Sequence, residues 1–271
     1  MSLVSTNWLG KNCSKVKIID SSWHMPSSNR NAYEEYKKEH IKNAIFFDID
    51  KFSNKKINLP HMLPNESEWG KIVSNLGIAN NDRIIIYDNS DVLSACRCWY
   101  TFIFFGHKKN LISVLNGGFS KWKNENRKIT DKIPILKKKK YKAQKNSQLV
   151  KTKKQIDKNI SEKNFQLIDA RSKKRFLGLE KEPRPSTKSG SIPNSLCLPF
   201  GELIDPTNKT FLKINKIREK FSELGIIKEK NVAFSCGSGI TATVLGLAYS
   251  LINDKYLPII YDGSWAEYGK V

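Results

Sequence analysis

Cys236 lies in a stretch whose residue types are suited to covalent chemistry. It ends the apolar run "VAFS" and is followed by "GSGIT" (237–241), which leads into a helical pattern. Gly237 and Gly239 allow the backbone to curl so that its N–H groups converge on one point. Those groups, with the positive end of a helix expected to begin near Gly239 or Ile240, favour a thiolate over a thiol. The pattern therefore predicts a nucleophilic cysteine.

A second interpretation of the stretch is a glycine-rich turn in which the cysteine is only a small apolar side chain. This interpretation suits Cys96 and Cys98 in the apolar helical stretch "SACRCWYTFIFFG", and Cys197 in the strand-like "SLCLPF". The Cys96–Cys98 pair has no second ligand pair or histidine cluster near it, so we predict no metal site. Five scattered cysteines are typical of reduced thiols in a cytoplasmic protein rather than of a disulfide framework.

The elements that position this cysteine occur twice in the chain. "LGIANNDRIIIYD" (76–88) aligns without a gap with "LGIIKEKNVAFSC" (224–236), and "VKIIDSS" aligns at almost the same offset with "FQLIDAR". "VLNGGFSKW" and "IIYDGSWAEY" continue the series further along. We therefore infer two homologous domains, in which the first has Asp88 where the second has Cys236.

In each copy, short apolar runs bounded by turns alternate with helical patterns, which is typical of parallel sheets covered on both faces. The predicted fold class is α/β, with two domains that each contain a mostly parallel sheet flanked by helices. We predict a non-catalytic domain over 1–130, a Lys-rich linker over 131–148 and a catalytic domain over 149–271. Strands are expected near 16–20, 44–49, 83–88, 111–115, 165–169, 195–199, 231–235 and 257–261. Helices are expected near 31–39, 66–75, 94–106, 212–224 and 240–252.

The chain has 271 residues and a formal net charge of +21. The excess is nearly all lysine spread over the whole sequence, which indicates a compositional bias or a generally anion-attracting surface rather than nucleic-acid binding as the main role. The densest cluster, "LKKKKYKAQKNSQ" (136–148), lacks the apolar spacing of a recognition helix and is expected to be a solvated connector. No membrane span, signal peptide or transit peptide is predicted, so we expect a cytoplasmic location.

Several longer motifs give the chain a resemblance to a known family. "SCGSGITA" (235–242) with "DARSKKRFLGLEKEPRPSTKSGSIPNSLCLPF" (169–200) resembles the tandem-domain sulfurtransferases of the rhodanese superfamily, and among them the 3-mercaptopyruvate sulfurtransferases. "HMLP" (61–64), "LNGGFSKW" (115–122) and "YDGSWAEYG" (261–269) match family patterns as well. The resemblance covers almost the whole chain and implies two tandem rhodanese-like domains.

The resemblance implies a sulfurtransferase that carries sulfur as a persulfide on Cys236. Its thiolate would attack the outer sulfur of a small anionic donor and release the remnant, which is pyruvate when the donor is 3-mercaptopyruvate. Cyanide, a low-molecular-weight thiol or a small dithiol protein would then accept the sulfur. No cofactor is implied, because the cysteine carries the sulfur itself. The loop backbone would stabilise thiolate and persulfide through the N–H groups of Gly237, Ser238, Gly239, Ile240 and Thr241.

Arg175 in "RFLG" and Arg184 in "EPRP" match the substrate-binding positions of the family. A guanidinium group binds a carboxylate through two parallel hydrogen bonds, which a lysine does less specifically. The resemblance also implies a hydrogen-bonded chain of Asp50, His61 and Ser238. Such a chain would deliver a proton to the departing enolate or polarise the carbonyl group of the donor.

The residues after the cysteine bear on the choice of donor and of reaction. Thiosulfate-preferring relatives tend to have basic residues there, so Gly237 and Ser238 favour 3-mercaptopyruvate, with thiosulfate:cyanide sulfur transfer as the alternative. Two positions depart from the family pattern, because Ser191 stands where histidine is frequent and Pro60 where aspartate is common. A cysteine phosphatase needs an arginine six residues after its cysteine, and Ala242 at that position argues against phosphoryl chemistry. A non-catalytic basic interaction module is the remaining alternative.

Overall fold

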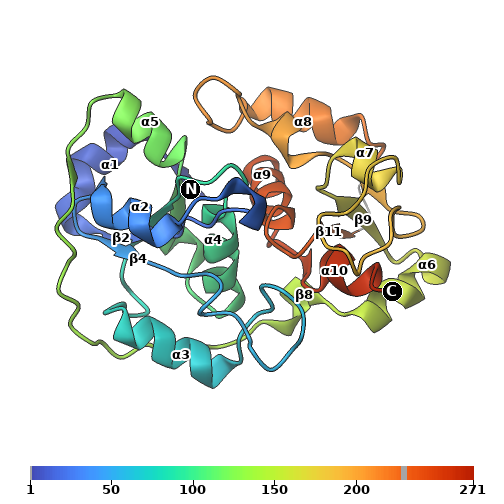
Figure 1. Cartoon of the computed structure of the whole chain (residues 1–271), viewed down its shortest axis with the longest axis horizontal. Helices are drawn as coiled ribbons and strands as arrows, with labels where there is room; N and C mark the ends of the chain where they lie inside the picture. The colour runs from blue at the N-terminus through green and yellow to red at the C-terminus, as the bar shows by residue number, and fades with distance from the viewer. Residues whose placement is uncertain (1, 227–230) are drawn as a thin grey trace. The chain divides into compact units, whose positions relative to one another are not determined.

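The computed structural model of the chain describes residues 2–226 and 231–271, and Figure 1 labels its elements. The chain divides into two compact units. Unit 1 extends to Asn54 and continues over Pro64–Asn146 and Pro206–Thr210. Unit 2 contains Lys55–Leu63, Ser147–Asp205 and Phe211–Val271. A short segment from the first half of the sequence therefore belongs to the second unit.

Unit 1 contains a parallel five-stranded sheet in the order β1-β6-β5-β2-β4. Its strands are β1 (Leu3–Val4), β2 (Lys17–Asp20), β4 (Ala44–Phe46), β5 (Ile84–Tyr87) and β6 (Ile112–Leu115). All four residues of the central strand β5 are buried, which explains why "IIIY" shows no alternation of apolar and polar residues. The short strands β3 (His40–Ile41) and β7 (Ile129–Thr130) form a separate antiparallel pair.

Unit 2 contains a second parallel sheet, in the order β10-β9-β11-β12-β8. Its strands are β8 (Val150–Lys151), β9 (Phe165–Asp169), β10 (Leu196–Cys197), β11 (Asn231–Ser235) and β12 (Ile260–Tyr261). Read from β8, this order is the order of unit 1. The register agrees as well, because Tyr87 pairs with Asp20 in unit 1 and Ser235 pairs with Asp169 in unit 2. The predicted α/β class with two repeated parallel sheets is confirmed.

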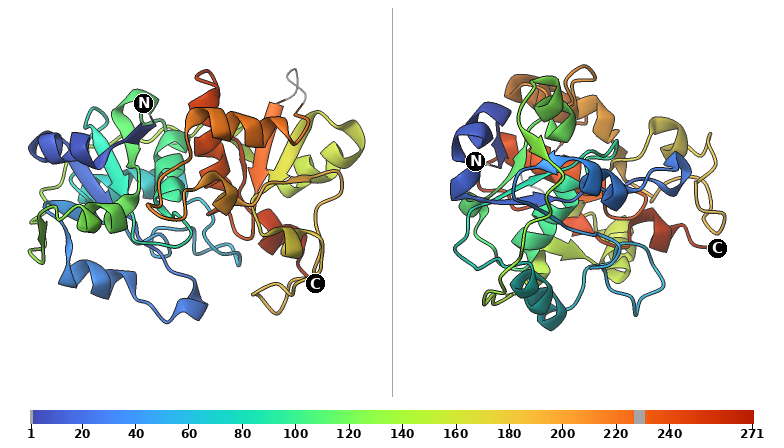
Figure 2. Two further views of the ribbon diagram at one scale, coloured as in Figure 1. Left: turned by 90° about the horizontal axis from the view of Figure 1, so that it is seen from above. Right: turned by 60° about the vertical axis from the view of Figure 1, so that its left-hand side comes forward.

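Helices flank both sheets and can be followed in Figure 2. The α-helices of unit 1 are α1 (Thr6–Asn12), α2 (Ala32–Lys38), α3 (Glu66–Asn75), α4 (Ala95–Phe104) and α5 (Gly118–Asn124). Those of unit 2 are α6 (Lys153–Glu162), α7 (Lys173–Phe176), α8 (Ile214–Ser222), α9 (Ala242–Ile252) and α10 (Ser264–Tyr268). Short 3-10 turns are found at Cys13–Lys15, Pro26–Ser28, Lys109–Leu111, Ser147–Leu149 and Phe200–Leu203. Within residues 2–226 and 231–271, no helix is both long and apolar enough to cross a membrane.

The helices that follow the central strands are almost wholly buried. Every residue of α4 is buried, including Cys96 and Cys98, and most residues of α9 are buried too. Both helices are mostly apolar on all faces, and a helix of this kind is stable only when it is buried on all sides. α9 begins at Ala242, two to three residues later than expected, because Gly239 has a φ of +78° that cannot be part of a right-handed helix. The sequence patterns did not predict the helices α1, α5, α6, α7 and α10.

The Lys-rich segment expected as a linker is fastened to unit 1 along most of its length. Its backbone N–H groups at Lys139 and Gln144 donate to the carbonyl oxygens of Ser74 and Phe105, both at 3.0 Å. The side chain of Tyr141 is buried. Unit 1 accordingly extends to Asn146, and 131–148 as the boundary between two domains stays a prediction.

Candidate active site

Cys236 lies directly after β11, at the carboxyl end of the central strand of unit 2. Only 2% of its surface is exposed. The neighbouring strand β9 ends at Asp169, which pairs with Ser235, so the two strand ends meet at the same edge of the sheet. The cysteine therefore lies where ligands of open parallel sheets collect.

The backbone after Cys236 curls because α10 binds its carbonyl groups. Trp265 N donates to the carbonyl oxygen of Cys236 at 2.8 Å, and Ala266 N donates to that of Gly237 at 2.9 Å. With these carbonyl groups held by α10, a later N–H group of the loop turns toward the sulfur. Gly239 N donates to Cys236 Sγ at 3.1 Å. A backbone N–H that donates to sulfur stabilises negative charge on it.

Ser264, the first residue of α10, fixes the cysteine from the other side. Its Oγ accepts a hydrogen bond from Cys236 N at 3.1 Å, lies 4.0 Å from Cys236 Sγ, and donates to the carbonyl oxygen of Tyr261 at 2.8 Å. Ser264 is fully buried and has a left-handed φ of +49°. A serine in this strained conformation is uncommon outside functional sites. Sequence reasoning missed this residue, although "YDGSW" was already among the family-like motifs.

The two predicted substrate-binding arginines converge on Gly237. A Cβ atom built at Gly237 would lie 3.2 Å from Arg175 Nη2 and 3.8 Å from Arg184 Nη1. A side chain at position 237 would therefore compete with both guanidinium groups for space. Their convergence beside the cysteine loop forms a cationic region suited to a carboxylate or another small oxyanion.

Glu182 holds one of these arginines in place. Its carboxylate accepts hydrogen bonds from Arg175 Nε at 3.1 Å and from Arg175 Nη2, and it also binds Arg171 Nη1 at 2.7 Å. The Glu182 side chain is only 3% exposed. Arg171 is buried as well, bound to Asp169 at 2.7 Å and lying over the ring of Trp265 at 4.3 Å. Arg171 therefore has a structural role, and Glu182 is a positioning residue that the sequence patterns did not reveal.

His61 and Ser238 are in contact within unit 2. His61 Nδ1 lies 3.0 Å from Ser238 Oγ and 3.3 Å from the carbonyl oxygen of Ser238. A carbonyl oxygen can only accept, so both contacts are satisfied when Nδ1 carries the proton. In that tautomer the hydroxyl hydrogen of Ser238 is available to another acceptor. The hydrogen bond from Leu63 N to Asp262 Oδ2 at 2.8 Å fastens the histidine segment to the unit.

Asp50, the third member of the predicted chain, belongs to unit 1. Its carboxylate accepts a hydrogen bond from Trp23 Nε1 at 2.8 Å. The Ser238–His61 contact is thus part of the structure, whereas the participation of Asp50 stays a prediction.

The remaining loop residues complete the turn into α9. Ile240 is buried, and Thr241 is the N-terminal cap residue of α9. Their carbonyl groups accept hydrogen bonds from Thr243 N and Val244 N, both at 3.1 Å. This tight turn continues directly into α9, so only a few residues separate the Cys236 sulfur from the first turn of the helix.

The other four thiols lie in surroundings that suppress ionisation. Burial raises the pKa of Cys197 to about 11 and raises the pKa values of Cys13, Cys96 and Cys98 as well. All five cysteines are free. Among the residues that the structure describes, no group of three or more His, Cys, Asp or Glu side chains is arranged to hold a metal ion.

Comparison with known proteins gives a consistent result over nearly the whole chain. Residues 5–125 and 152–270 each match the family of rhodanese-like domains. The mouse 3-mercaptopyruvate sulfurtransferase is 35% identical over 98% of this chain and 91% of its own length. The mitochondrial thiosulfate/3-mercaptopyruvate sulfurtransferase 1 of Arabidopsis thaliana is 38% identical over 98% of this chain and 75% of its own length. The crystal structure of SseA, a 3-mercaptopyruvate sulfotransferase from Escherichia coli, matches with a TM-score of 0.87 at 30% identity, covering 98% of this chain and 99% of SseA.

Proposed function

The chain belongs to the rhodanese family and is a sulfurtransferase, and we propose that it moves sulfur from 3-mercaptopyruvate through a persulfide on Cys236. The observation that carries this proposal is the cysteine loop itself. Cys236 Sγ accepts a hydrogen bond from Gly239 N, and two guanidinium groups lie next to the intervening Gly237. A thiolate beside a carboxylate-binding region suits a short donor that contains both a thiol and a carboxylate, as 3-mercaptopyruvate does.

The first half-reaction transfers one sulfur atom to the protein. The Cys236 thiolate attacks the thiol sulfur of 3-mercaptopyruvate, the carbon–sulfur bond breaks, and its electron pair leaves with the carbon as the enolate of pyruvate. The sulfur stays on the protein as a hydropersulfide. One proton taken up by the enolate then gives pyruvate. The reaction needs no external oxidant or reductant.

The second half-reaction returns the cysteine to its starting state. A thiolate acceptor attacks the outer sulfur of the persulfide, the sulfur–sulfur bond breaks, and Cys236 leaves as a thiolate stabilised by Gly239 N. Cyanide reacts in the same way and gives thiocyanate. The physiological acceptor that we propose is a low-molecular-weight thiol or a small dithiol protein.

The arginines orient the donor. A carboxylate bound between Arg175 and Arg184 would direct the thiol end of a short donor toward the sulfur. Because Glu182 already binds Nε and Nη2 of Arg175, this guanidinium keeps one orientation before the donor arrives.

Ser238 and His61 act on the oxygen of the leaving group. With Nδ1 of His61 donating to Ser238, the serine hydroxyl donates to the keto oxygen of the donor, where negative charge develops as the enolate forms. Asp50 is proposed as the group that orients the histidine.

Thiosulfate is the alternative donor, and the names of the similar proteins include both activities. Gly237 bears on this choice, since a basic side chain there would run into Arg175 and Arg184. Without a basic side chain at this position the site has no extra cation for the dianionic thiosulfate, which favours the monoanionic carboxylate donor. A cytoplasmic location also stays a proposal, because one similar protein is mitochondrial.

A side-by-side comparison of donors tests the function. We expect purified protein to release pyruvate from 3-mercaptopyruvate with a dithiol acceptor faster than it forms thiocyanate from thiosulfate and cyanide. C236S should abolish both reactions and the mass increment of about 32 Da that one bound sulfur adds. The matched variant C197S should keep both. Turnover of thiosulfate without pyruvate release would overturn the donor, and a persulfide that survives C236S would overturn the carrier.

A further inference from the structure

A pocket of about 530 Å³ lies in unit 1, at the end of the sheet where β2 and β5 begin. Asp88 lies at the opposite end, where β5 finishes. The pocket is lined by Lys17, the first residue of β2, and by Arg83, which directly precedes β5. The extended Lys-rich segment forms another wall with Lys137 and Lys139. The proposed sulfur transfer uses none of these residues.

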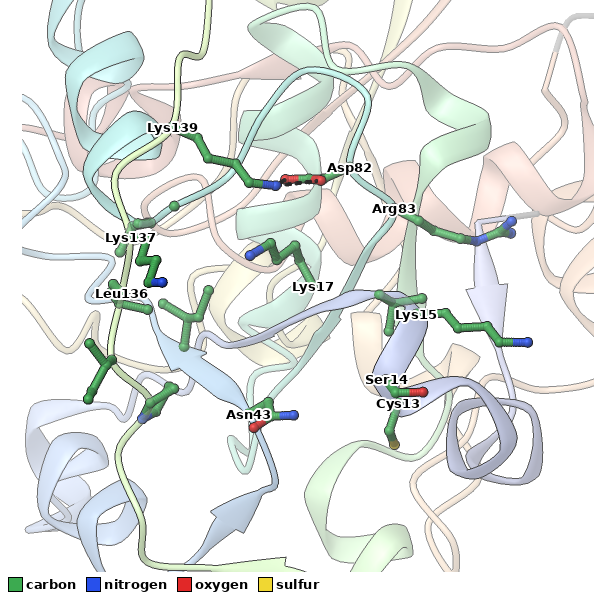
Figure 3. Close-up of a pocket in the computed structure, with 16 residues that line it drawn as sticks. Cys13, Ser14, Lys15, Lys17, Asn43, Asp82, Arg83, Leu136, Lys137 and Lys139 are labelled. Carbon is green, nitrogen blue, oxygen red and sulfur yellow. Dashed lines mark hydrogen bonds and ion pairs between the residues drawn. The ribbon is translucent and has the colours of Figure 1, made fainter.

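The pocket has more positive charge than its own carboxylate can neutralise. Of its lining residues five are basic and one is acidic, namely Lys15, Lys17, Arg83, Lys137, Lys139 and Asp82. Lys139 is paired with Asp82 at 3.0 Å. Figure 3 shows the amino groups of Lys17 and Lys137 turned into the same part of the pocket as this pair. Within residues 2–226 and 231–271, neither the amino group of Lys17 nor that of Lys137 has a hydrogen-bond or ion-pair partner.

Two of these cationic side chains have neutral counterparts in unit 2. In the aligned repeats, Lys17 takes the place of Gln166, and Arg83 takes the place of Asn231. Arg83 is also unusual in its contacts, because its guanidinium lies 5.1 Å over the ring of Trp8 and its Nε is buried without a hydrogen-bond partner. Figure 3 shows this guanidinium turned away from the amino groups of Lys17 and Lys137, so Arg83 adds to the positive potential of the pocket rather than to the direct contacts.

Part of the remaining lining of the pocket is apolar. Ile45, Leu76, Pro134 and Leu136 line it on the side of the Lys-rich segment. A volume of a few hundred cubic ångströms with apolar walls and a few charged groups is typical of sites for small molecules. Lysine is a frequent ligand of phosphate groups, which carry more charge than a single carboxylate.

We propose that this pocket binds a small phosphorylated molecule with an apolar body, of the size and charge of a nucleoside diphosphate. The phosphate groups lie between Lys17 and Lys137, and the body of the ligand packs against Leu136 and Ile45. A nucleic-acid strand is a different partner, because it needs stacking aromatic side chains, and this pocket has none in its lining.

Calorimetric titration of the full chain with ADP, inorganic pyrophosphate and a short single-stranded oligoribonucleotide tests the proposal. ADP should bind, and the double variant K17Q/K137Q should weaken its binding at least about tenfold by removing two charge-assisted contacts. The control K108Q/K128Q removes the same charge from exposed lysines of unit 1 outside the pocket and should change ADP affinity less than about twofold. Melting temperature and pyruvate release, measured on both double variants, show whether each remains folded.

The apolar wall has its own variant. L136S should weaken ADP more than pyrophosphate, because only ADP has a body that packs there. Failure of ADP to bind, equal losses in the two double variants, or binding of the oligoribonucleotide alone would each overturn the proposal. Pyrophosphate binding as tightly as ADP would overturn the part that concerns the apolar body.

Discussion

The loop after β5 and the loop after β11 occupy the same place in two sheets of the same order, but only the second has a thiol. The carbonyl oxygen of Asp88 accepts a hydrogen bond from Phe119 N at 2.8 Å, and that of Cys236 accepts one from Trp265 N, also at 2.8 Å. The two loops therefore share not only the strand order but also this backbone hydrogen bond to the helix that follows. The difference in chemistry between the two loops therefore comes from their side chains.

The side chains of Asp88 and Cys236 both accept hydrogen bonds from backbone N–H groups of the residues that follow them. The Asp88 carboxylate accepts hydrogen bonds from Ala95 N at 2.6 Å, at the start of α4, and from Ser90 N at 3.2 Å. Cys236 Sγ accepts from Gly239 N. Unit 1 thus has its own carboxylate at the strand end, whereas unit 2 directs an N–H group at an atom that can form and break bonds. A backbone N–H group faces the side chain at the strand end in both units, and the residue type at that position determines the chemistry.

Each loop also has an arginine–glutamate pair beside it. In unit 1, Glu35 binds Arg30 through both oxygens at 2.7 Å, and Arg30 Nη2 also donates to the carbonyl oxygen of Asn89 at 3.0 Å. In unit 2, Arg175 is bound by Glu182 and lies next to Gly237. The residue after the strand end is Asn89 in unit 1 and Gly237 in unit 2, so only in unit 2 does the arginine lie beside a position without a side chain.

The largest expected effect separates these two arginines. R175Q should lower kcat/KM for 3-mercaptopyruvate about 100-fold, since charge-assisted hydrogen bonds to a carboxylate contribute up to ~3 kcal/mol. R175K should recover part of this loss. R30Q should lower the free energy of unfolding but change kcat/KM less than about twofold. Steady-state kinetics with denaturant titration measure both, and a comparable kinetic loss in R30Q would contradict the assignment of roles.

The second prediction concerns the first residues of α5 and α10, each of which is replaced by the residue type found in the other. Gly118 and Ser264 are counterparts with φ values of +55° and +49°. A Cβ at Gly118 would lie 2.6 Å from the carbonyl oxygen of Asp88, so G118S should lower the free energy of unfolding by about 2–3 kcal/mol.

S264G should behave in the opposite way. It relieves the left-handed strain but removes the hydroxyl group that accepts from Cys236 N, so stability should change by less than ~1 kcal/mol while kcat falls about tenfold. Chemical denaturation and single-turnover persulfide formation measure the two effects. A purely structural role of Ser264 would instead leave kcat unchanged.

Sequence periodicity located four of the five strands in each parallel sheet and missed the edge strands β1 and β8. It placed Cys236 at the end of a central strand, but it did not reveal the groups around this cysteine. The repeat alignment that paired Asp88 with Cys236 depends on local apolar runs, and the strand register agrees with it. Ser264 and Glu182 act across separations in sequence that no helical or strand period connects. Nothing in the spacing of "GLEKEPRPS" indicates which glutamate turns toward the arginines.

The start of α9 and the location of the histidine illustrate the same limit. The left-handed φ of Gly239 delays the helix, and a glycine in the sequence does not reveal which φ it adopts. His61 precedes most of unit 1 in the chain but belongs to unit 2, which follows from tertiary contacts such as that of Leu63 with Asp262.

The third prediction concerns the buried carboxyl group of Asp88 in unit 1. Burial raises the pKa of Asp88 to about 7, whereas an unfolded aspartate has a pKa of about 3.9. Between these values the folded protein binds more protons than the unfolded chain, so the free energy of unfolding falls as the pH rises through this window.

Substitution of the carboxylate removes this dependence. Relative to D88N, wild type should lose about 2 kcal/mol of stability between pH 5 and pH 8, because each pH unit in the window corresponds to at most ~1.4 kcal/mol. Urea titrations of both proteins across this range measure the difference. Parallel curves would show that Asp88 is ionised in the folded protein throughout.

The smallest expected effect concerns the residue after each strand end. G237A places a Cβ 3.2 Å from Arg175 Nη2, a contact that the guanidinium relieves by moving a few tenths of an ångström. We expect kcat/KM for 3-mercaptopyruvate to fall about two- to fivefold, equivalent to less than ~1 kcal/mol, without loss of stability. N89A removes the hydrogen bond to Glu35 and should lower stability slightly without a kinetic effect. If G237A slowed 3-mercaptopyruvate and thiosulfate equally, the space beside Gly237 would serve the loop itself rather than the recognition of a carboxylate.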